Sequence, residues 1–341
     1  MARLFSVFVS VIFLCTSTSN HTDIVQRFVK FINDFEKPYK TGTAEFFQRL
    51  EIFKHNLQQI DKLNEPYKTG TPVYGVTQFS DLSPEEFKAQ YLNDLRTTQP
   101  HGTSLKFASK KSPAFAGLPH QPKADPTIVD WREKGVVSPV KDQGQCKTSW
   151  AFAAAEVMES AYGIKYNVSA PLLSVQQLID CTTKVGNHGC ENGDICVALS
   201  YIGEYGGITY ESEYPLTNKD GTCHLQPGSK TVELHYYNCM LLVGFEDLFV
   251  DYLYTVGPVA AAVDATTWQN YKGGVIQYNC SSDLNHSVQV VGYNMTGPVP
   301  YYIVRNSWGT KFGMDGYLYV KIGGNLCGIA TQVSDVFLKE A

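Results

Sequence analysis

The eight cysteines in the C-terminal part of this chain constrain its fold more than any other feature. They lie at positions 146, 181, 190, 196, 223, 239, 280 and 327, whereas the ninth, Cys15, lies near the N-terminus. An even number of cysteines in a secreted protein favours disulfides over metal ligation. His188 lies close to Cys190, but the spacing matches no zinc-binding pattern. The sequence therefore predicts a disulfide-linked C-terminal domain with no metal and no cofactor.

The first residues indicate the secretory route. Arg3 precedes an apolar run from Leu4 to Cys15 and then small residues, which is typical of a signal peptide over residues 1–19. The run is shorter than the roughly 20 residues that span a bilayer. Sequons for N-glycosylation, which occurs on this route, are present at Asn20, Asn167, Asn279, Asn285 and Asn294. We expect a protein of the secretory pathway, lysosomal or extracellular, with no membrane partner.

The segment that follows reads as helical. Apolar residues recur at helical spacing over 24–35 and again over 46–63. A third helix is predicted to start at Ser83, with proline in its first turn and Glu86 completing a capping box. Residues 106–126 are rich in Pro, Ser and Lys, show no apolar period and are predicted to be a linker.

The C-terminal part has a different pattern. A helix is expected around 150–165 and another from Ser174, where Ser174 and Gln177 suggest a second capping box. Alternating or β-branched segments then occur between glycine-rich turns, at 288–293, 301–305 and 317–321. Helices followed by strands predict an α+β domain.

Charge divides the chain at the same place. Residues 20–124 hold 14 Lys/Arg and 11 Asp/Glu, whereas the chain from Asp125 onward holds 13 and 22. A basic segment before an acidic domain is what a propeptide docked by electrostatic attraction would show, and protonation of carboxylates in acid would weaken it. An ordinary helical N-terminal domain is the alternative. The net charge of −5 without a Lys/Arg-rich run argues against a nucleic-acid partner.

Three motifs carry a resemblance to a known family. The segment PVKDQGQCKTSWAF, Pro139 to Phe152, resembles the active-site segment of papain-like cysteine proteases, in which Gln-Gly-x-Cys-Gly-Ser-Cys-Trp-Ala-Phe is typical. His286, followed by the apolar run VQVVGY, resembles the family's histidine strand, and Arg305 to Gly309 (RNSWG) resembles its asparagine motif. The intervals of 137 residues from Ser149 to His286 and 20 more to Asn306 agree with the family's spacing.

The resemblance extends to the N-terminal part. A spaced pattern typical of the family's helical propeptide is formed by Glu45, Arg49, Phe53, Asn56, Ile60 and Asn64. Gly75 to Asp81 resembles the short motif that follows it, with Thr77 where Asn is usual. The resemblance implies a signal peptide (1–19), an inhibitory propeptide and linker (20–124) and a peptidase domain (125–341). The implied peptidase fold has a helical half and a β-barrel-like half with a cleft between them, and the propeptide is an implied partner.

The resemblance also assigns roles at the site. Ser149 stands at the nucleophile position, His286 would be its base, and Asn306 would orient His286. Gln143 would donate to the oxyanion together with the Ser149 backbone N–H. Against the family pattern, Ser149 replaces the cysteine, Lys147 and Thr148 replace small residues, and Phe312 replaces a common tryptophan.

Four further residues would contact substrate. Gly193 would hydrogen-bond extended substrate backbone, Ile195 and Leu284 would line the pocket for the second residue before the scissile bond, and Trp308 would shield the His–Asn hydrogen bond. Each has a structural alternative, such as a core position for Ile195 and Trp308. The disulfides implied by the family are Cys146–Cys190, Cys181–Cys223 and Cys280–Cys327, while Cys196 and Cys239 form either a fourth bridge or free thiols.

The serine decides the expected chemistry. A helix N-terminus and an imidazolium stabilise a thiolate, but a hydroxyl is too weak an acid to ionise there and must be deprotonated by His286 during attack. We therefore expect a monomer whose cleft binds peptides and whose hydrolysis is strongly impaired or lost. Residual peptidase activity, a sequence substitution of Cys by Ser149, and a Ser–His hydrolase remain alternatives, so whether the chain is an enzyme stays open. The sequon at Asn285 is expected to be unmodified because its strand would bury it.

Overall fold

The computed structural model describes residues 23–67, 70–93, 106–107 and 126–340. The predicted signal peptide, the sequon at Asn20 and most of the predicted linker lie outside these residues.

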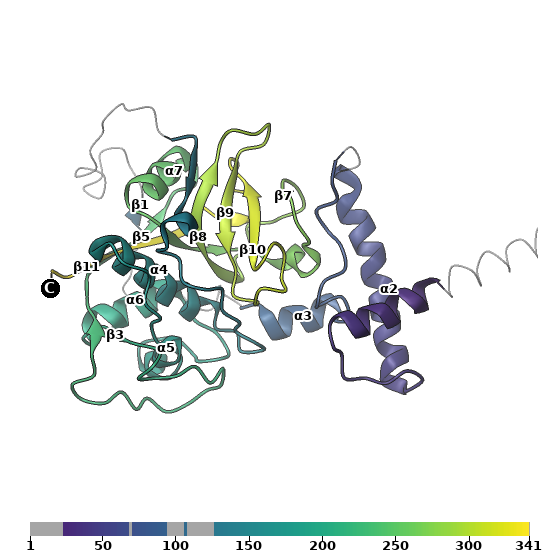
Figure 1. Ribbon diagram of the computed structural model, residues 1–341, viewed down its shortest axis with the longest axis horizontal. Helices are drawn as coiled ribbons and strands as arrows, with labels where there is room; N and C mark the ends of the chain where they lie inside the picture. Colours follow the sequence, from purple (N-terminus) through teal and green to yellow (C-terminus); the bar gives the residue numbers. More distant parts are fainter. Residues whose placement is uncertain (1–22, 68–69, 94–105, 108–125, 341) are drawn as a thin grey trace, which may run out of the picture.

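The N-terminal helices form a separate group on one side of the molecule (Figure 1). They are a helix over 23–34, α2 (Ala44–Asn64), η1 (Glu65–Tyr67) and α3 (Pro84–Tyr91). Their apolar faces meet in a cluster of aromatic rings in which Phe28 is fully buried. The capping box predicted for Ser83 is confirmed, because each partner bonds the backbone of the other. The helical pattern of this part is confirmed as well.

A second group of helices forms what we call the helical lobe. Its elements are α4 (Ser149–Tyr166), α5 (Val175–Cys181), η4 (Thr182–Lys184), α6 (Ile195–Glu204) and the short pair β3 (Ile208–Thr209) and β4 (Thr231–Val232). Because α4 is buried on most sides, its sequence is apolar almost all round, with small alanines in its first half. The second predicted capping box is wrong. Ser174 does cap α5, but the Gln177 amide instead bonds Thr209 N–H and the Gly207 carbonyl, which ties β3 to the helix.

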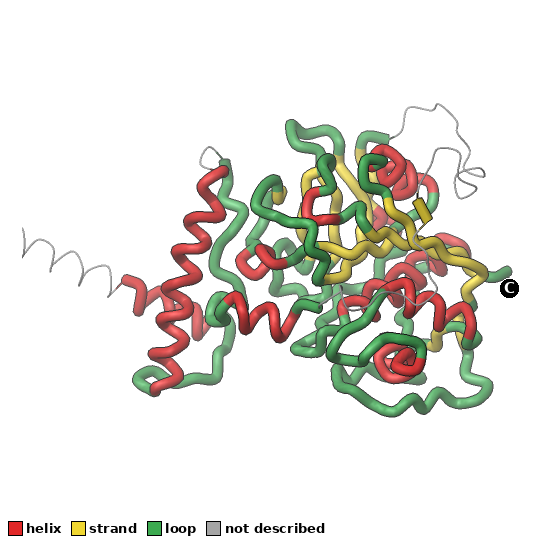
Figure 2. The backbone as a smooth tube through the Cα atoms, turned by 180° about the vertical axis from the view of Figure 1, so that it is seen from behind, coloured by secondary structure: helices red, strands yellow, loops and turns green. Residues whose placement is uncertain are grey.

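A nine-stranded sheet forms the other lobe, which we call the sheet lobe (Figure 2). Its strand order is β1-β5-β11-β6-β8-β9-β10-β7, with β2 paired to β8. The strands are β1 (Lys106–Phe107), β2 (Ile128–Asp130), β5 (Leu234–Leu241), β6 (Val259–Val263), β7 (Val275–Ile276), β8 (His286–Asn294), β9 (Tyr301–Arg305), β10 (Tyr317–Lys321) and β11 (Gln332–Leu338). The helices η3 (Trp131–Lys134), α7 (Glu246–Thr255), η5 (Thr266–Asn270) and η6 (Leu326–Gly328) complete this part. The three predicted strand segments are confirmed.

Two features of the sheet were not expected from the sequence. Lys106 and Phe107, at the start of the predicted linker, instead pair in parallel with β5. Strand β8 carries an irregularity between Val290 and Gly292, and a Cβ at Gly292 would lie 2.0 Å from the Val129 carbonyl oxygen of β2. Only glycine allows β2 to approach this closely.

Four disulfides link the described C-terminal residues. The three implied pairs form, and Cys196 bonds Cys239 in a fourth. This fourth bridge joins α6 of the helical lobe to β5 of the sheet lobe. Each bridge closes a loop of 42 to 47 residues, which in the chain-entropy account corresponds to about 4 kcal/mol.

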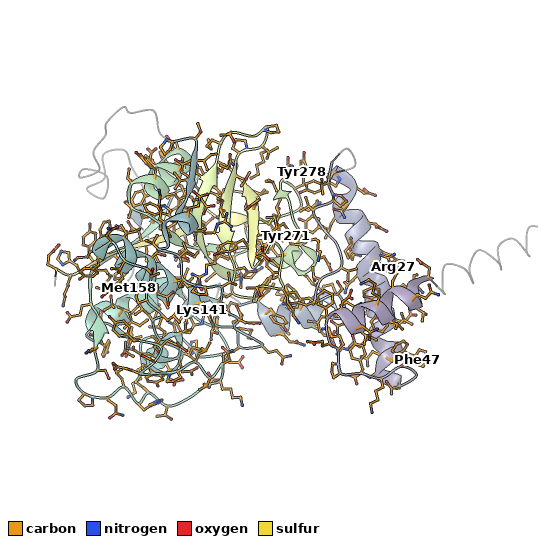
Figure 3. All side chains as sticks on the ribbon, in the orientation of Figure 1. Arg27, Phe47, Lys141, Met158, Tyr271 and Tyr278 are labelled. Carbon is orange, nitrogen blue, oxygen red and sulfur yellow. A yellow bond between two sulfur atoms is a disulfide. The ribbon has the colours of Figure 1, made fainter. Side chains whose placement is uncertain are left out.

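The N-terminal helices dock on the sheet lobe through neutral contacts. The rings of Phe79, Phe87 and Tyr91 surround the Trp308 indole, and the Gln269 amide donates to the Phe79 carbonyl. At the far end of α2, a Tyr67 ring contacts Tyr278, which Figure 3 labels on the facing edge of the sheet lobe. Among the described residues, one ion pair crosses this boundary, Lys311–Glu36 at 3.5 Å, and both partners are exposed. These contacts do not support the expectation of electrostatic docking.

Candidate active site

Three side chains that are distant in sequence meet where the helical lobe contacts the sheet lobe. Ser149 is the first residue of α4, His286 is the first residue of β8, and Asn306 directly follows β9. All three are fully buried. His286 Nε2 lies 2.8 Å from Asn306 Oδ1, and the Ser149 hydroxyl accepts a 3.2 Å hydrogen bond from the backbone N–H of Ser287. The structure therefore brings these three predicted site residues together.

The hydrogen-bond partners of Ser149 are not those of an activated nucleophile. Its Oγ accepts from Ser287 N–H and from Asn93 Nδ2, each at 3.2 Å. Because an amide oxygen only accepts, the hydrogen of the imidazole lies on Nε2, so Nδ1 is the basic nitrogen. Within the described residues, this buried Nδ1 of His286 has no hydrogen-bond partner. The base and the hydroxyl are present, but they are not joined by a hydrogen bond.

Burial controls the charge of the histidine. Removal from water lowers the pKa of His286 to about 4, and the hydrogen bond to Asn306 opposes this only in part. The Trp308 ring lies 4.6 Å from the imidazole, centroid to centroid, and Trp268 approaches it edge-on at 6.2 Å. The imidazole is thus neutral in mild acid, and no anion stands beside it because a serine hydroxyl does not ionise.

Gln143 lies beside the start of α4. Its backbone N–H donates to the Ser307 carbonyl at 2.9 Å, and its side-chain oxygen accepts from Ser307 Oγ at 2.7 Å. Its amide nitrogen donates to the Cys146 carbonyl at 3.1 Å. The residue is held rigidly next to the site, and its oxyanion role stays a prediction.

The predicted substrate-binding residues separate into two groups. Leu284 lines a cavity of about 580 Å³ together with Lys88 and Asn93 of the N-terminal part. Ile195 is buried in the apolar core of the helical lobe, 1% exposed. This position agrees with the core alternative given for Ile195, and its pocket role stays a prediction.

The other two lie at the site boundary. A Cβ at Gly193 would lie 2.3 Å from the Trp150 ring, which explains the glycine without reference to substrate. Trp308 packs against the imidazole of His286, and its shielding of the His286–Asn306 hydrogen bond stays a prediction.

Asn93 is the site residue that sequence reasoning missed. It follows α3, is 2% exposed, and its backbone N–H donates to the Asn285 carbonyl at 2.7 Å while its side chain reaches Ser149. It lies beyond the propeptide motifs, so no spacing pattern pointed to it. The N-terminal part therefore covers Ser149 directly.

The neighbouring sequon is buried. Asn285 is 7% exposed, and its amide donates to Asp264 and Thr266 while its side-chain oxygen accepts from Ala265 N–H. These hydrogen bonds fit the prediction that Asn285 is unmodified.

Neither a metal-binding cluster nor a membrane-spanning helix is found in the described part of the chain. No group of three or more His, Cys, Asp or Glu side chains there could hold a metal ion. No helix of that part is both long and apolar enough to cross a bilayer.

Comparison with known proteins gives the family. The papain family cysteine protease domain matches residues 125–337, and the cathepsin propeptide inhibitor domain matches residues 28–87. Cathepsin O of Homo sapiens is 41% identical over 273 residues, 79% of this chain and 80% of that protein, and cathepsin O of Mus musculus is 41% identical over 271 residues, 79% and 83%.

Solved structures of similar proteins agree with this family match. A digestive procathepsin L2 proteinase from Tenebrio molitor larval midgut has a TM-score of 0.82 at 33% identity, covering 92% of this chain and 100% of that structure. The stem bromelain precursor has a TM-score of 0.78 at 29% identity, covering 93% and 100%. The chain thus belongs to the papain family of cysteine proteases and carries a cathepsin propeptide inhibitor domain of its own.

Proposed function

We propose that this chain is a cathepsin O-like proenzyme scaffold whose cleft binds extended peptides and whose hydrolytic activity is strongly impaired or lost. One observation carries the proposal. The residue at the nucleophile position is a serine whose hydroxyl accepts hydrogen bonds from Ser287 and Asn93, while His286 Nδ1 has no partner among the described residues.

The expected loss of activity follows from how a cysteine and a serine would each lose their proton at this site. A cysteine at the start of α4 would lose its proton to the imidazole and remain a thiolate, stabilised by the helix N-terminus. A serine must be deprotonated during attack, and a histidine whose pKa is lowered to about 4 is a weak base for that purpose. Turnover is therefore expected to fall by several orders of magnitude.

The rest of the site supports peptide binding. The N-terminal part already places a polypeptide against Ser149, with a backbone hydrogen bond between Asn93 and Asn285. The cavity beside Leu284 stays open next to that segment. The chain is extended at Leu92, after the end of α3, and Asn93 then makes its backbone hydrogen bond at the site. A cleft that accepts such a segment has the properties needed to accept an extended peptide.

The setting proposed is the secretory pathway, lysosomal or extracellular, and the molecule acts as a monomer on protein or peptide ligands. The four disulfides support an oxidising compartment of synthesis.

The binding claim has a direct test. A fluorescent peptide copying residues 84–93 is titrated into the chain after removal of its N-terminal part, and mass spectrometry follows the peptide at pH 5. Saturable binding with an intact peptide is expected, and a control peptide with alanine at the positions of Phe87 and Asn93 should bind at least tenfold more weakly. Absence of saturable binding would refute the proposed function.

A Ser–His hydrolase is the second candidate. It is favoured by one contact, since Ser287 N–H holds the Ser149 hydroxyl beside the strand of His286. Hydrolysis of the same peptide by the native chain, abolished by His286→Ala, would support it.

A further inference from the structure

Behind the site lies a cluster of buried charged and polar side chains, which we call the buried polar hub. It consists of Ser138, Lys141, Glu156, Glu159, Gln289 and Arg305. All but Lys141 are 3% exposed or less, and the Lys141 side chain is 15% exposed. Two carboxylates and two cations balance in charge, which is the condition for burying them.

The ion pair at the centre of the hub joins α4 to β9. Arg305 is 0% and Glu156 is 2% exposed, and Arg305 Nη2 lies 3.1 Å from Glu156 Oε1, in an ion-pair contact without hydrogen-bond geometry. Arg305 also donates to Gln289 Oε1, Ser138 Oγ and the Pro139 carbonyl. Because a guanidinium does not lose its proton, Arg305 requires a carboxylate at this depth, and Glu156 supplies it.

A second pair extends the hub toward Gln143. Lys141 Nζ lies 2.5 Å from Glu159 Oε1, and Figure 3 labels Lys141. Glu159 lies about one helical turn after Glu156 on α4. Glu159 also accepts from Ser138 Oγ and from Leu173 N–H. The segment that leads to Gln143 is thereby fixed to the same helix.

The hub includes residues from the four chain segments that carry Gln143, Ser149, His286 and Asn306. Arg305 directly precedes Asn306, and Lys141 lies two residues before Gln143. Gln289, three residues after His286, donates to the Glu156 carbonyl at 2.9 Å. Glu156 itself lies seven residues after Ser149, two turns further along α4.

We propose that Glu156 and Arg305 form a positioning pair that sets Asn306 relative to α4 and so holds the imidazole of His286 in register with residue 149. The reason is geometric. Asn306 directly follows Arg305, and its Oδ1 accepts from His286 Nε2 at 2.8 Å, so the backbone that the guanidinium anchors also sets the position of that acceptor. The inference rests on the proposed function only in taking these residues as the site.

The test uses the His286–Asn306 hydrogen bond itself in the full-length native chain. The Nε2–H proton of His286 is observed by NMR with ¹⁵N-histidine labelling and assigned with His286→Gln. In the native chain this proton should exchange slowly with water, because it is buried and bonded. In Glu156→Gln it should exchange at least tenfold faster, with the four disulfides and the secondary structure intact.

A matched control separates positioning from general loss of stability. Glu246 accepts hydrogen bonds from Asn325 N–H and from the hydroxyl of Tyr302, which lies on the same strand as Arg305 but toward its other end. Glu246→Gln makes the same chemical change away from the site and should leave the His286 proton unchanged.

The pH dependence gives an independent readout. Burial raises the pKa of Glu156 to about 7, against the lowering effects of Arg305 and Lys141, while Glu159 raises it further. The chemical shift of the His286 proton in the native chain should therefore show a pH step above the usual range of a carboxyl group. In Glu156→Gln this step should be absent.

Two outcomes would overturn the proposal. One is a folded Glu156→Gln chain whose His286 proton keeps the native exchange rate and pH step. Should that variant fail to fold, the double variant Glu156→Gln with Arg305→Gln removes both buried charges together, and a native His286 signal there would equally refute it. Peptide turnover is not a readout here, so failure of the positioning pair leaves the proposed function standing.

Discussion

Ser149 differs from a cysteine in what it does to its neighbours. Its hydroxyl accepts from the backbone of Ser287 and from the Asn93 amide, and it carries no charge. Without a thiolate beside it, the imidazole of His286 receives no electrostatic support for its protonated form, and burial lowers its pKa to about 4. Burial thus sets the neutral state of His286, and Ser149 adds no anion that would oppose it.

The lowered pKa of His286 predicts how the stability of the chain changes with pH. The pKa of His286 is about 4 in the folded chain and about 6.5 when unfolded. Between these values the unfolded chain binds the proton more readily, so the contribution of His286 to stability is complete above pH 6.5 and is lost as pH falls toward 4. From pH 7 to pH 4.5 this should lower the free energy of unfolding by about 2–3 kcal/mol.

Chemical denaturation of the native chain and of His286→Gln at both pH values measures the effect. The variant should lose clearly less stability on acidification than the native chain. An equal loss in the two chains would show that His286 is not the group responsible.

The disulfides and the other local signals show how much the sequence could predict at the level of elements. The capping box at Ser83, the helix starting near Trp150 and the strand after His286 were predictable because each depends on neighbours in the chain. The fourth disulfide could only be given as one of two alternatives, since the distance between Cys196 and Cys239 depends on how the lobes pack.

Other features depend on contacts between elements and carry no local signal. Gln177 bonds β3 instead of closing a capping box, and Ile195 is part of the buried core of the helical lobe. Asn93 reaches Ser149 only because α3 docks against Trp308 and directs the following residues across the site.

The docking of α3 depends on one ring more than on any charge. Phe87 is 1% exposed and packs against Phe79, Tyr91 and the Trp308 indole. Phe87→Ala should therefore destabilise the docked N-terminal part by about 3–5 kcal/mol, the usual cost of truncating a buried phenylalanine.

Release of α3 from the sheet lobe can be measured by hydrogen exchange of the α3 amides in the full-length chain. Phe47→Ala is the matched control, because Phe47 is 56% exposed on α2 and lies on the outer side of the N-terminal helices (Figure 3). If the two variants exchange alike, the aromatic packing around Trp308 does not hold α3 in place.

At the scale of the whole molecule, charge distribution and docking are separate properties. Residues 20–124 carry an excess of Lys/Arg and the rest of the chain an excess of Asp/Glu. Yet the one ion pair between these parts among the described residues, Lys311–Glu36, is exposed and spans 3.5 Å. Exposed pairs of this kind contribute about 0–1 kcal/mol. The excess charge favours encounter, while neutral hydrogen bonds and aromatic packing hold the docked state.

Salt should therefore have little effect on the closed form. Raising the ionic strength from 50 to 500 mM is expected to change the exchange rate of the α3 amides less than twofold, because screening acts on charges and not on apolar contacts. Glu36→Gln should behave the same way. Tenfold faster exchange of the α3 amides at high salt would instead show that electrostatic attraction holds the N-terminal part in place.

The most direct test of the account compares peptide turnover at pH 5 by the native chain and by Ser149→Cys. Both are freed of the N-terminal part by an external protease that is then quenched, and both are matched for folded mass. We predict that the Cys chain cuts and that the native chain is slower by at least about 10³-fold, because only the thiolate can form beside His286. Native turnover within tenfold of the Cys chain, abolished by His286→Ala, would contradict it, and so would a folded Ser149→Cys chain that does not cut.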